Sequence, residues 1–437
     1  MKRLALFFAL TLAAASHAAL TGPTAASIAT QIEARLTALF QATDVLASDH
    51  AVLLATHYRR ALAATVTPAA RADLLAKLLE RCNAPPPLQQ PPGDLVRVPA
   101  PALVDDGAHD TLEEALRWAI NATRKETRTV LPFGRRGVKR KDLLASLELF
   151  ARLVATTPDS RELARKVAAQ FDTYRSPGLA PSGDVLYTAY HAPIFDGRLK
   201  PDARYRWPVY AEPRTVGLAN ERYARADVAR GALSGRGLEL AYLADPMDAY
   251  LLEIEGSGLV QLPQGRCLKV EFAAKNGQPY KSLGKTMVRL GMITPWEMSI
   301  PAIRHAFARE PKRLRETLDT NPSQVYFKAT LLDEVPRTLD YVPQRSVACD
   351  QTYFPRAGIG FALLERPDVK PDGEQVGWVP HHRYIINQDT GSAIRGAGHI
   401  DLYWGHDVTS GNVAGSTREP GALFYFLKRG TALVARR

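Results

Sequence analysis

The sequence predicts a mainly β protein with N-terminal α-helices, preceded by a separate helical extension. Three observations support this fold class. Apolar residues follow a helical spacing over residues 24–82, a proline-rich stretch then breaks the pattern, and short apolar runs after Pro177 are separated by Gly, Pro and Asp. Such runs bounded by turn residues are typical of strands in barrels or sandwiches. With 437 residues, 46% hydrophobic and 23% charged, the chain is long enough for two or three domains.

The N-terminus has the features of an export signal. Lys2 and Arg3 precede an apolar run from Leu4 to Ala15, and the small residues Ser16 and Ala18 follow it. This pattern is typical of a cleaved signal peptide, and the run is too short for a permanent membrane span. The first cysteine is Cys82, so no lipid attachment site lies near the cleavage point. We therefore expect residues 1–18 to be a signal peptide, and the protein to be periplasmic and at most peripheral to the outer membrane.

The helical extension is expected over residues 19–82, where Ile28, Ile32, Leu36 and Phe40 share one helix face. Residues 83–106 follow, beginning with AsnAlaProProProLeuGlnGlnProProGly. Prolines in this number cannot propagate a helix and form semi-rigid spacers. The sequence thus predicts a linker and a domain boundary there.

The remaining elements follow from periodicity and capping. Asp110 and Glu113 form a helix start before an apolar stripe, and two further helices are expected near 141–156 and 159–173. Apolar runs predict strands, and helical spacing returns around 287–318. The runs interpreted as strands are residues 185–190, 249–254, 269–272, 325–328 and 361–365.

Charge and cysteine content restrict the function class. The formal charge of +11 favours negatively charged partners, and export makes a cell-envelope partner more consistent than a nucleic acid, for which no binding motif is present. Three cysteines cannot form a disulfide framework, and whether Cys267 pairs with Cys349 stays open. His399 with Asp401 matches no common metal-ligand spacing, so we expect no metal site.

Asp401 is the main catalytic candidate. It lies in the segment 386–405, flanked by Ile400, Leu402 and Tyr403. If buried there, its carboxyl pKa should rise, because burial disfavours the charged form, and such an acid donates a proton near neutral pH. Asp389 opens an AspThrGlySer stretch that fits an ordinary turn and also an aspartic-protease turn. A protease needs two such carboxylates and this chain has one such triplet, so that interpretation requires a symmetric dimer.

Three segments combine aromatic, hydroxyl, amide and glycine residues in the manner of a sugar-binding groove. They are residues 188–193, 245–258 and 321–327. Aromatic faces stack on sugar rings, and polar groups with close glycine backbones fix hydroxyl and N-acetyl groups. Each segment taken alone also fits a turn or a helix boundary.

The order of these motifs resembles the membrane-bound lytic murein transglycosylase A family with its C-terminal three-Asp domain. The resemblance covers about residues 110–429, from ThrAlaTyrHisAlaPro at 188–193 to the AspLeuTyrTrpGly that begins at Asp401. It implies a double-psi β-barrel domain interrupted by a second β-barrel-like domain. Residues 107–193 would hold helices and the first part of the catalytic domain, 194–332 the inserted domain, and 333–437 the rest of the barrel.

The resemblance also implies roles for individual residues. Asp401 would be the general acid and base, with Asp389 and Asp350 in supporting roles. Four positions depart from the family pattern: Ala192 stands for Glu, Ser392 for Gly, and Glu253 and Glu255 for Gln. These departures bear on substrate preference. The implied substrate-binding residues are Thr188, Tyr190, Glu255, Gly256, Ser257, Gly258, Asn321, Ser323 and Tyr403.

The implied reaction is cleavage of the β-1,4 bond between N-acetylmuramic acid and N-acetylglucosamine in peptidoglycan, with a 1,6-anhydro product and no cofactor. The expected partner is a glycan strand, the expected state is a monomer, and the N-terminal helices are candidates for contacting other cell-wall proteins. Two alternatives stay open: a hydrolytic muramidase using Asp389 as a second carboxylate, and a non-catalytic peptidoglycan-binding protein. Whether cleavage is internal or terminal also stays open.

Overall fold

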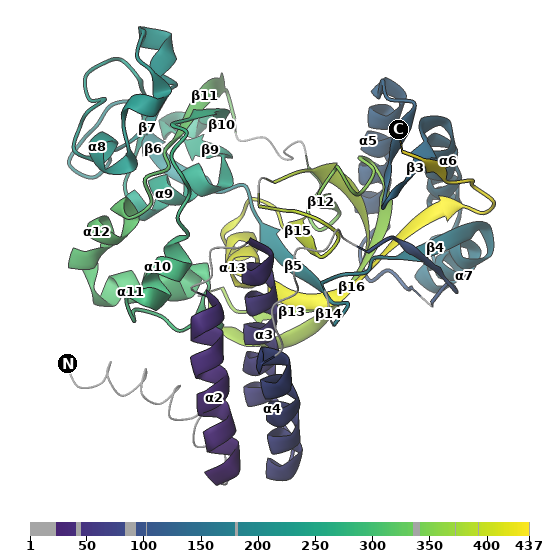
Figure 1. Cartoon of the computed structure of the whole chain (residues 1–437). Coiled ribbons are helices and arrows are strands. Elements are labelled where there is room, and N and C mark those ends of the chain that lie inside the picture. The colour runs from purple at the N-terminus through teal and green to yellow at the C-terminus, as the bar shows by residue number, and fades with distance from the viewer. Residues whose placement is uncertain are drawn as a thin grey trace.

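The computed structural model describes residues 23–40, 45–83, 93–101, 103–179, 182–334, 341–371, 373–391 and 393–436. The expected signal peptide and Ser392 lie outside these residues. Figure 1 shows three N-terminal helices below two β-rich parts, one formed by the middle of the chain and one mostly by its C-terminal third. Within the described part of the chain, no helix is both long and apolar enough to span a membrane.

The N-terminal extension is helical, as predicted. Helices α2 (Pro23–Phe40), α3 (Val45–Ala63) and α4 (Pro68–Asn83) enclose a core of their own that includes Ile32, Leu36, Phe40 and Leu75. Helix α3 also contacts the rest of the protein. Its Thr56 hydroxyl donates to the Arg418 carbonyl at 2.7 Å. One face of the extension is therefore buried against its own chain.

The predicted linker is wrong for residues 93–106, while residues 84–92 lie outside the described residues. Strand β1 (Val96–Val98) pairs antiparallel with β4 (Phe171–Arg175). The buried Asp105 carboxylate accepts from Arg345 at 2.6 Å. The pairing of β1, the partly buried Val98 and the buried Asp105 carboxylate hold this stretch on the protein, and prolines alone do not reveal that.

The helices predicted after the linker are present as α5 (His109–Lys125), α6 (Arg140–Thr156) and α7 (Ser160–Gln170). Helix α7 ends three residues early, because Phe171 starts β4 and pairs with Lys428 of the barrel. A small sheet of β2 (Val130–Phe133), β3 (Arg136–Lys139) and β17 (Val434–Ala435) lies beside these helices.

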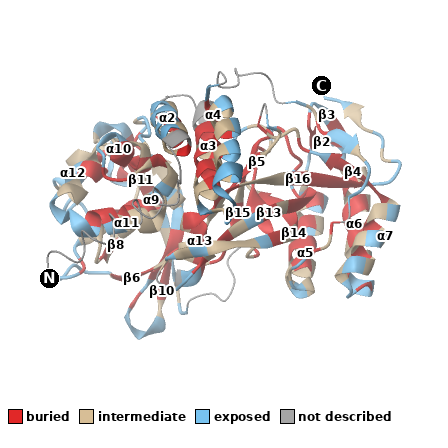
Figure 2. Ribbon diagram, turned by 90° about the horizontal axis from the view of Figure 1, so that it is seen from below, coloured by how far each residue is buried: buried red, intermediate tan, exposed pale blue. Residues whose placement is uncertain are grey.

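Six strands of the largest sheet close into a ring. In order they are β16 (Arg418–Lys428), β13 (Ile359–Val369), β14 (Gln375–Asp389), β12 (Ser346–Ala348), β15 (His399–Tyr403) and β5 (Val185–Tyr190), and β5 pairs back with β16. The β12–β14 and β15–β5 pairs are parallel. Helix α13 (Val408–Ser416) connects β15 to β16. Figure 2 shows buried residues concentrated along β13 and β16. Strand β5 reaches this ring from before the inserted part of the chain.

The inserted part forms a second, curled sheet. Its order is β11 (Val325–Leu332), β10 (Cys267–Lys275), β9 (Ser257–Gln261), β6 (Ile194–Arg198), β8 (Glu239–Leu243) and β7 (Trp207–Tyr210). A bridge between Ala211 and Phe327 brings its two ends together. Short helices surround it: α8 (Arg225–Ala229), α9 (Pro246–Glu255), α10 (Leu283–Arg289), α11 (Ile300–Arg309) and α12 (Leu314–Asp319). The chain therefore has two curled sheets of different origin.

Two sequence predictions are corrected here. Residues 249–254 form helix α9 instead of a strand, because the Asp245 carboxylate caps its first turn by accepting from the Met247 amide at 2.8 Å. The helical stretch predicted over 287–318 is divided into α10, α11, α12 and short turns that begin at Pro295 and Pro311. Over the described residues helix exceeds strand, so "mainly β" understates the helical content.

The open question about the cysteines is also answered. Cys82, Cys267 and Cys349 are all buried free thiols. Each lies in a different part of the protein: helix α4, the inserted sheet and the barrel.

Candidate active site

Asp401 lies on β15, between two neighbouring strands that place its side chain. In the parallel pair with β5 it stands opposite Thr188, and in the antiparallel pair with β12 opposite Ala348. Side chains alternate along a strand, so Ile400 and Leu402 enter the core, where both are fully buried. Asp401 shares the other face with Tyr403.

The surroundings of Asp401 favour its protonated form. Burial raises the pKa of this carboxyl, and the nearby Asp389 charge raises it further. Two groups act in the opposite direction: Thr188 donates its hydroxyl to Asp401 Oδ1 at 2.6 Å, and His399 lowers the pKa through its charge. The net direction is upward, so Asp401 keeps its proton to a higher pH than an ordinary aspartate.

Three tyrosine rings form a wall beside Asp401. Tyr190 on β5 and Tyr403 on β15 are paired in register, and their ring centroids are 5.3 Å apart. Tyr341 completes the cluster at 6.3 Å from Tyr190 and 5.6 Å from Tyr403. Rings at these distances attract edge to face and keep a rigid surface.

The other two aspartates expected at the site are hydrogen-bonded to their surroundings. Asp389 accepts the Tyr190 hydroxyl at 2.9 Å. Asp350 accepts from the Gly396 amide at 2.7 Å and from the Thr352 hydroxyl at 2.7 Å. Asp389 thus orients the tyrosine wall, and Asp350 ties down the segment that leads into β15.

Glu255 of the inserted part interacts electrostatically with Asp401. It ends helix α9, and Gly256 follows with a positive φ of 74°, which turns the chain into β9. Burial raises the pKa of Glu255 to about 8, and the Asp401 charge adds to the effect. Glu255 is consequently neutral at pH 7 and can both donate and accept a hydrogen bond.

The two groove motifs of the sequence meet in space. Strand β6 directly follows Pro193 and pairs parallel with β9, and the Leu259 amide donates to the Pro193 carbonyl at 2.9 Å. Gly258 permits this approach, since a Cβ there would lie 3.1 Å from that carbonyl and 2.7 Å from Leu252. Ser257 beside it is exposed.

Tyr280 is a further aromatic residue of this region. Its side chain is 58% exposed. Surrounding protein nevertheless raises the pKa of its hydroxyl, and the Glu255 charge contributes in the same direction. Tyr280 therefore presents an exposed aromatic ring close enough to Glu255 to feel its charge.

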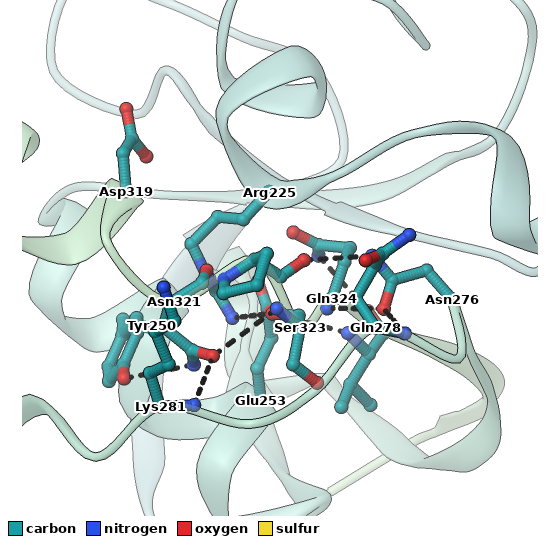
Figure 3. A network of polar contacts seen from close by, with 12 residues as sticks. Arg225, Tyr250, Glu253, Asn276, Gln278, Lys281, Asp319, Asn321, Ser323 and Gln324 are labelled. Atoms are coloured by element: carbon teal, nitrogen blue, oxygen red, sulfur yellow. Dashed lines mark hydrogen bonds and ion pairs between the residues drawn. The ribbon is translucent and has the colours of Figure 1, made fainter.

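Asn321 and Ser323 belong to a packed network inside the inserted part (Figure 3). Asn321 is 1% exposed, accepts from the Lys281 and Ser323 amides, and donates to the Tyr250 hydroxyl at 3.2 Å. The Ser323 carbonyl accepts from Arg225 at 2.7 Å. The structure therefore does not bring Asn321 to an accessible surface, unlike Thr188, Glu255 and Ser257. The predicted substrate-binding residue Tyr403 is also fully buried, because it packs into the tyrosine cluster.

Sequence reasoning missed His399, Tyr341 and Tyr280. His399 Nε2 lies 2.9 Å from the Thr188 hydroxyl oxygen. The two-residue period of a strand places His399 on the same face as Asp401, which is a usable signal. Among the described residues, no group of three or more His, Cys, Asp or Glu side chains is arranged to hold a metal ion.

Two family models match the chain. Residues 186–328 match the MltA specific insert domain, and residues 345–427 match the 3D domain. The first match covers the inserted part and the second covers most of the barrel. Helices α2–α4 lie outside both.

Curated relatives and solved structures agree with these matches. The chain is 34% identical over 250 residues to membrane-bound lytic murein transglycosylase A of Vibrio cholerae, which is 55% of this chain and 65% of the relative. It is 30% identical to the protein of that name from Escherichia coli K12, covering 56% and 66%. The matched region thus spans just under two thirds of these relatives' length.

The solved structures concern the fold. Escherichia coli MltA with bound chitohexaose superimposes with a TM-score of 0.63 at 24% identity, over 79% of this chain and 96% of that one. The membrane-bound lytic murein transglycosylase of Agrobacterium tumefaciens gives a TM-score of 0.60 at 23% identity, over 77% and 98%. The two-part architecture is therefore shared with these proteins.

Proposed function

Because the chain belongs to the membrane-bound lytic murein transglycosylase A family, we propose that it is a peptidoglycan lytic transglycosylase. It cleaves the β-1,4 bond between N-acetylmuramic acid and N-acetylglucosamine and leaves 1,6-anhydromuramic acid ends. The observation that carries the proposal is Asp401, an acid with a raised pKa beside a tyrosine wall and opposite Glu255.

Asp401 acts first as an acid and then as a base. Its raised pKa keeps a proton available for the glycosidic oxygen as positive charge develops on the sugar. The resulting carboxylate then accepts the proton of the C6 hydroxyl, whose oxygen closes the anhydro ring. Thr188, which donates to Oδ1 at 2.6 Å, stabilises this ionised form.

The groove binds a glycan strand. The Escherichia coli neighbour was solved with chitohexaose, and its fold matches this one. Tyr190 supplies a partly exposed ring that packs on the fully buried Tyr403, Tyr280 an exposed ring, and neutral Glu255 a hydrogen-bonding group where the family carries Gln. Gly256, Ser257 and Gly258 form the adjacent rim.

Asp389 and Asp350 support this site without taking part in proton transfer. Asp389 raises the pKa of Asp401 and holds the Tyr190 hydroxyl. Asp350 fixes the segment before β15 through Gly396. We assign the double-psi barrel that the family resemblance implies to the closed ring, whose two parallel strand pairs support this. We also propose that the protein works as a monomer in the periplasm.

One observation favours a second candidate, a hydrolytic muramidase. Glycosidases that use water place two carboxylates across the bond. Asp389 is hydrogen-bonded to Tyr190, but Glu255 faces Asp401 from the other part of the protein. Glu255 is therefore the residue to test as a second carboxylate.

Digestion of purified sacculi with mass analysis tests the proposal. Wild type should release muropeptides with anhydro ends, and Asp401→Asn should lower release by about 10³-fold, since the proposed general acid is removed. Asp196→Asn, an exposed carboxylate on β6, is the matched control and should retain full activity. Products heavier by one water would identify a muramidase, and binding to sacculi without release would identify a binding protein.

A further inference from the structure

Helix α3 places an acidic side chain behind the catalytic strand. Asp49 Oδ2 lies 3.2 Å from His399 Nδ1. Asp49 is 8% exposed and His399 is 6% exposed, so the pair is shielded from water. Asp49 belongs to the N-terminal helices, which lie outside both family matches, whereas His399 lies on β15, two residues before Asp401.

The contact continues to Asp401 through Thr188. His399 Nε2 is 2.9 Å from the Thr188 hydroxyl oxygen, and this hydroxyl is 2.6 Å from Asp401 Oδ1. We propose that Asp49 is a positioning residue, supplied by the N-terminal helices, which acts on the general acid through His399 and Thr188. The inference rests on the function proposed above for Asp401.

The direction of these hydrogen bonds determines how Asp49 acts on Asp401. When His399 carries two protons, its positive charge pairs with the Asp49 carboxylate beside Nδ1, and Nε2–H donates to Thr188. The Thr188 hydroxyl is then left to donate to an ionised Asp401. When His399 is neutral and its proton stays on Nδ1, Nε2 accepts from Thr188, whose oxygen can then accept from protonated Asp401. The orientation of one hydroxyl thus follows the two forms that Asp401 takes during turnover.

The charges around His399 favour its protonated form. Burial lowers its pKa, but the Asp49 and Asp401 carboxylates outweigh burial and the net direction is upward. Arg418 on β16 is paired with Thr188 and adds positive charge nearby. At the other end of this series of contacts, Asp401 interacts electrostatically with Asp389 and Glu255.

Docking of α3 fixes Asp49 in place. Asp49, Thr56 and Arg60 are seven and four residues apart, so they share one helix face. Thr56 donates to the Arg418 carbonyl at 2.7 Å, and Arg60 Nε donates to Glu419 at 2.9 Å. The same face therefore anchors the helix to the barrel and carries Asp49.

Kinetics of Asp49→Asn on solubilised glycan strands test this inference. We expect kcat to fall on the order of 10-fold with KM unchanged, as when an outer partner of a working side chain is removed. Without Asp49, His399 loses its proton at lower pH and no longer stabilises ionised Asp401. The pKa of Asp401 then rises, so the alkaline limb of kcat/KM should move to higher pH. Asp49→Glu, which keeps the carboxylate, should recover part of kcat.

His57→Gln is the matched control. His57 lies on the same helix and contacts Asp184 at 3.3 Å. It takes no part in the contacts that lead from Asp49 to Asp401. It should leave kcat and the pH profile unchanged. If Asp49→Asn has the kinetics and pH profile of His57→Gln, the inference is wrong.

A nitrogen-15 titration of histidines in the wild-type chain tests the pair without any variant of Asp49. The His399 resonance is the one missing in His399→Gln, and its pKa should lie above the ordinary 6.5. A value at or below 6.5 overturns the inference even if Asp49→Asn fails to fold. Loss of muropeptide release by wild type would instead refute the proposed function, while this titration would still report on the Asp49–His399 pair.

Discussion

Glu255 and Asp401 are two acids from different parts of the protein, and burial is the largest cause that raises the pKa of each. The Asp401 charge raises the pKa of Glu255 further, whereas the Asp389 charge adds to the rise for Asp401. Both carboxyls therefore bind protons that ordinary ones release, but Glu255 carries no hydroxyl partner comparable to Thr188. The difference suits Asp401 for cycling between two forms and Glu255 for staying neutral.

We predict that Glu255→Gln keeps activity at neutral pH within about fivefold, because a neutral hydrogen-bonding group is retained at a cost near 1 kcal/mol. In wild type, activity should decline as the pH rises through the Glu255 pKa of about 8, since its charge then opposes ionisation of Asp401. The variant should lack the part of the decline that follows Glu255 and keep the alkaline limb that ionisation of Asp401 causes. A pH series of muropeptide release measures it.

Complete loss of activity in Glu255→Gln at every pH would contradict this role. Combined with products that contain an added water, it would support the muramidase alternative. Glu253→Gln provides no clean control, because Glu253 pairs with Arg225 at 2.7 Å in the core of the inserted part.

At this scale the sequence pointed to Asp401 and its neighbour Thr188, but not to the contact between His399 and Asp49. Asp401, Thr188 and Tyr190 are recognisable because they lie in contiguous motifs. Strand alternation gives access to His399 as well. Asp49 leaves no local signal, because its contact depends on how α3 docks onto strands hundreds of residues later in the chain.

Among the elements, α3 depends on a buried carboxylate for its contact with the barrel. The Glu419 side chain is fully buried and faces Arg59 and Arg60. Arg418 beside it is also buried, and burial lowers the pKa of its guanidinium to about 9, with the Arg59 charge adding to this. Glu419 therefore balances positive charge on both sides of the contact.

We predict that Glu419→Gln lowers the free energy of unfolding by about 3 kcal/mol, because it leaves buried positive charge unbalanced. Glu365→Gln is the matched control. Its side chain is 54% exposed and pairs with Arg60 at 2.7 Å, so its loss should cost less than about 1 kcal/mol. Urea unfolding gives both values, and hydrogen exchange should show faster opening of α3 in Glu419→Gln. Equal effects of the two variants would refute the proposed importance of burial.

The elements show where local patterns suffice and where they fail. The strands at 185–190, 325–328 and 361–365 were predicted and are present, since their apolar runs are β-rich and bounded by turns. Residues 249–254 have a similar apolar run but form a helix, because Asp245 and Pro246 start one just before it. When an apolar run fits both a helix and a strand, the capping residues just outside it decide which of the two forms.

On the scale of the whole molecule, each cysteine reports on a different unit. Burial raises the pKa of Cys82 to about 11, and it also raises the pKa of Cys267 and Cys349. All three are thus shielded and weakly nucleophilic in the folded protein.

We predict that no cysteine reacts with iodoacetamide in the native protein and that Cys82 reacts first as urea is increased. Its helix belongs to the N-terminal core, which is smaller than the barrel core around Cys349. Mass mapping of alkylated peptides at each urea concentration measures the order. Simultaneous reaction of all three would mean that the chain unfolds as one unit.

The two-part plan of the molecule follows from the family resemblance and not from periodicity. Composition and spacing predicted the number of domains, but they do not reveal that β5 closes a ring with β15 and β16. Such pairings join segments on either side of the inserted part, and no local pattern encodes them.

Ring closure through β5 also constrains biogenesis. During translation Thr188 is synthesised well before Asp401. Strand β5 can pair with both of its neighbours, β15 and β16, only after β16 has been synthesised. A nascent or truncated polypeptide that stops short of β16 cannot assemble the cutting centre, because pairings this distant form only after the intervening chain exists. The topology itself therefore delays assembly of the proposed active site until synthesis is nearly finished.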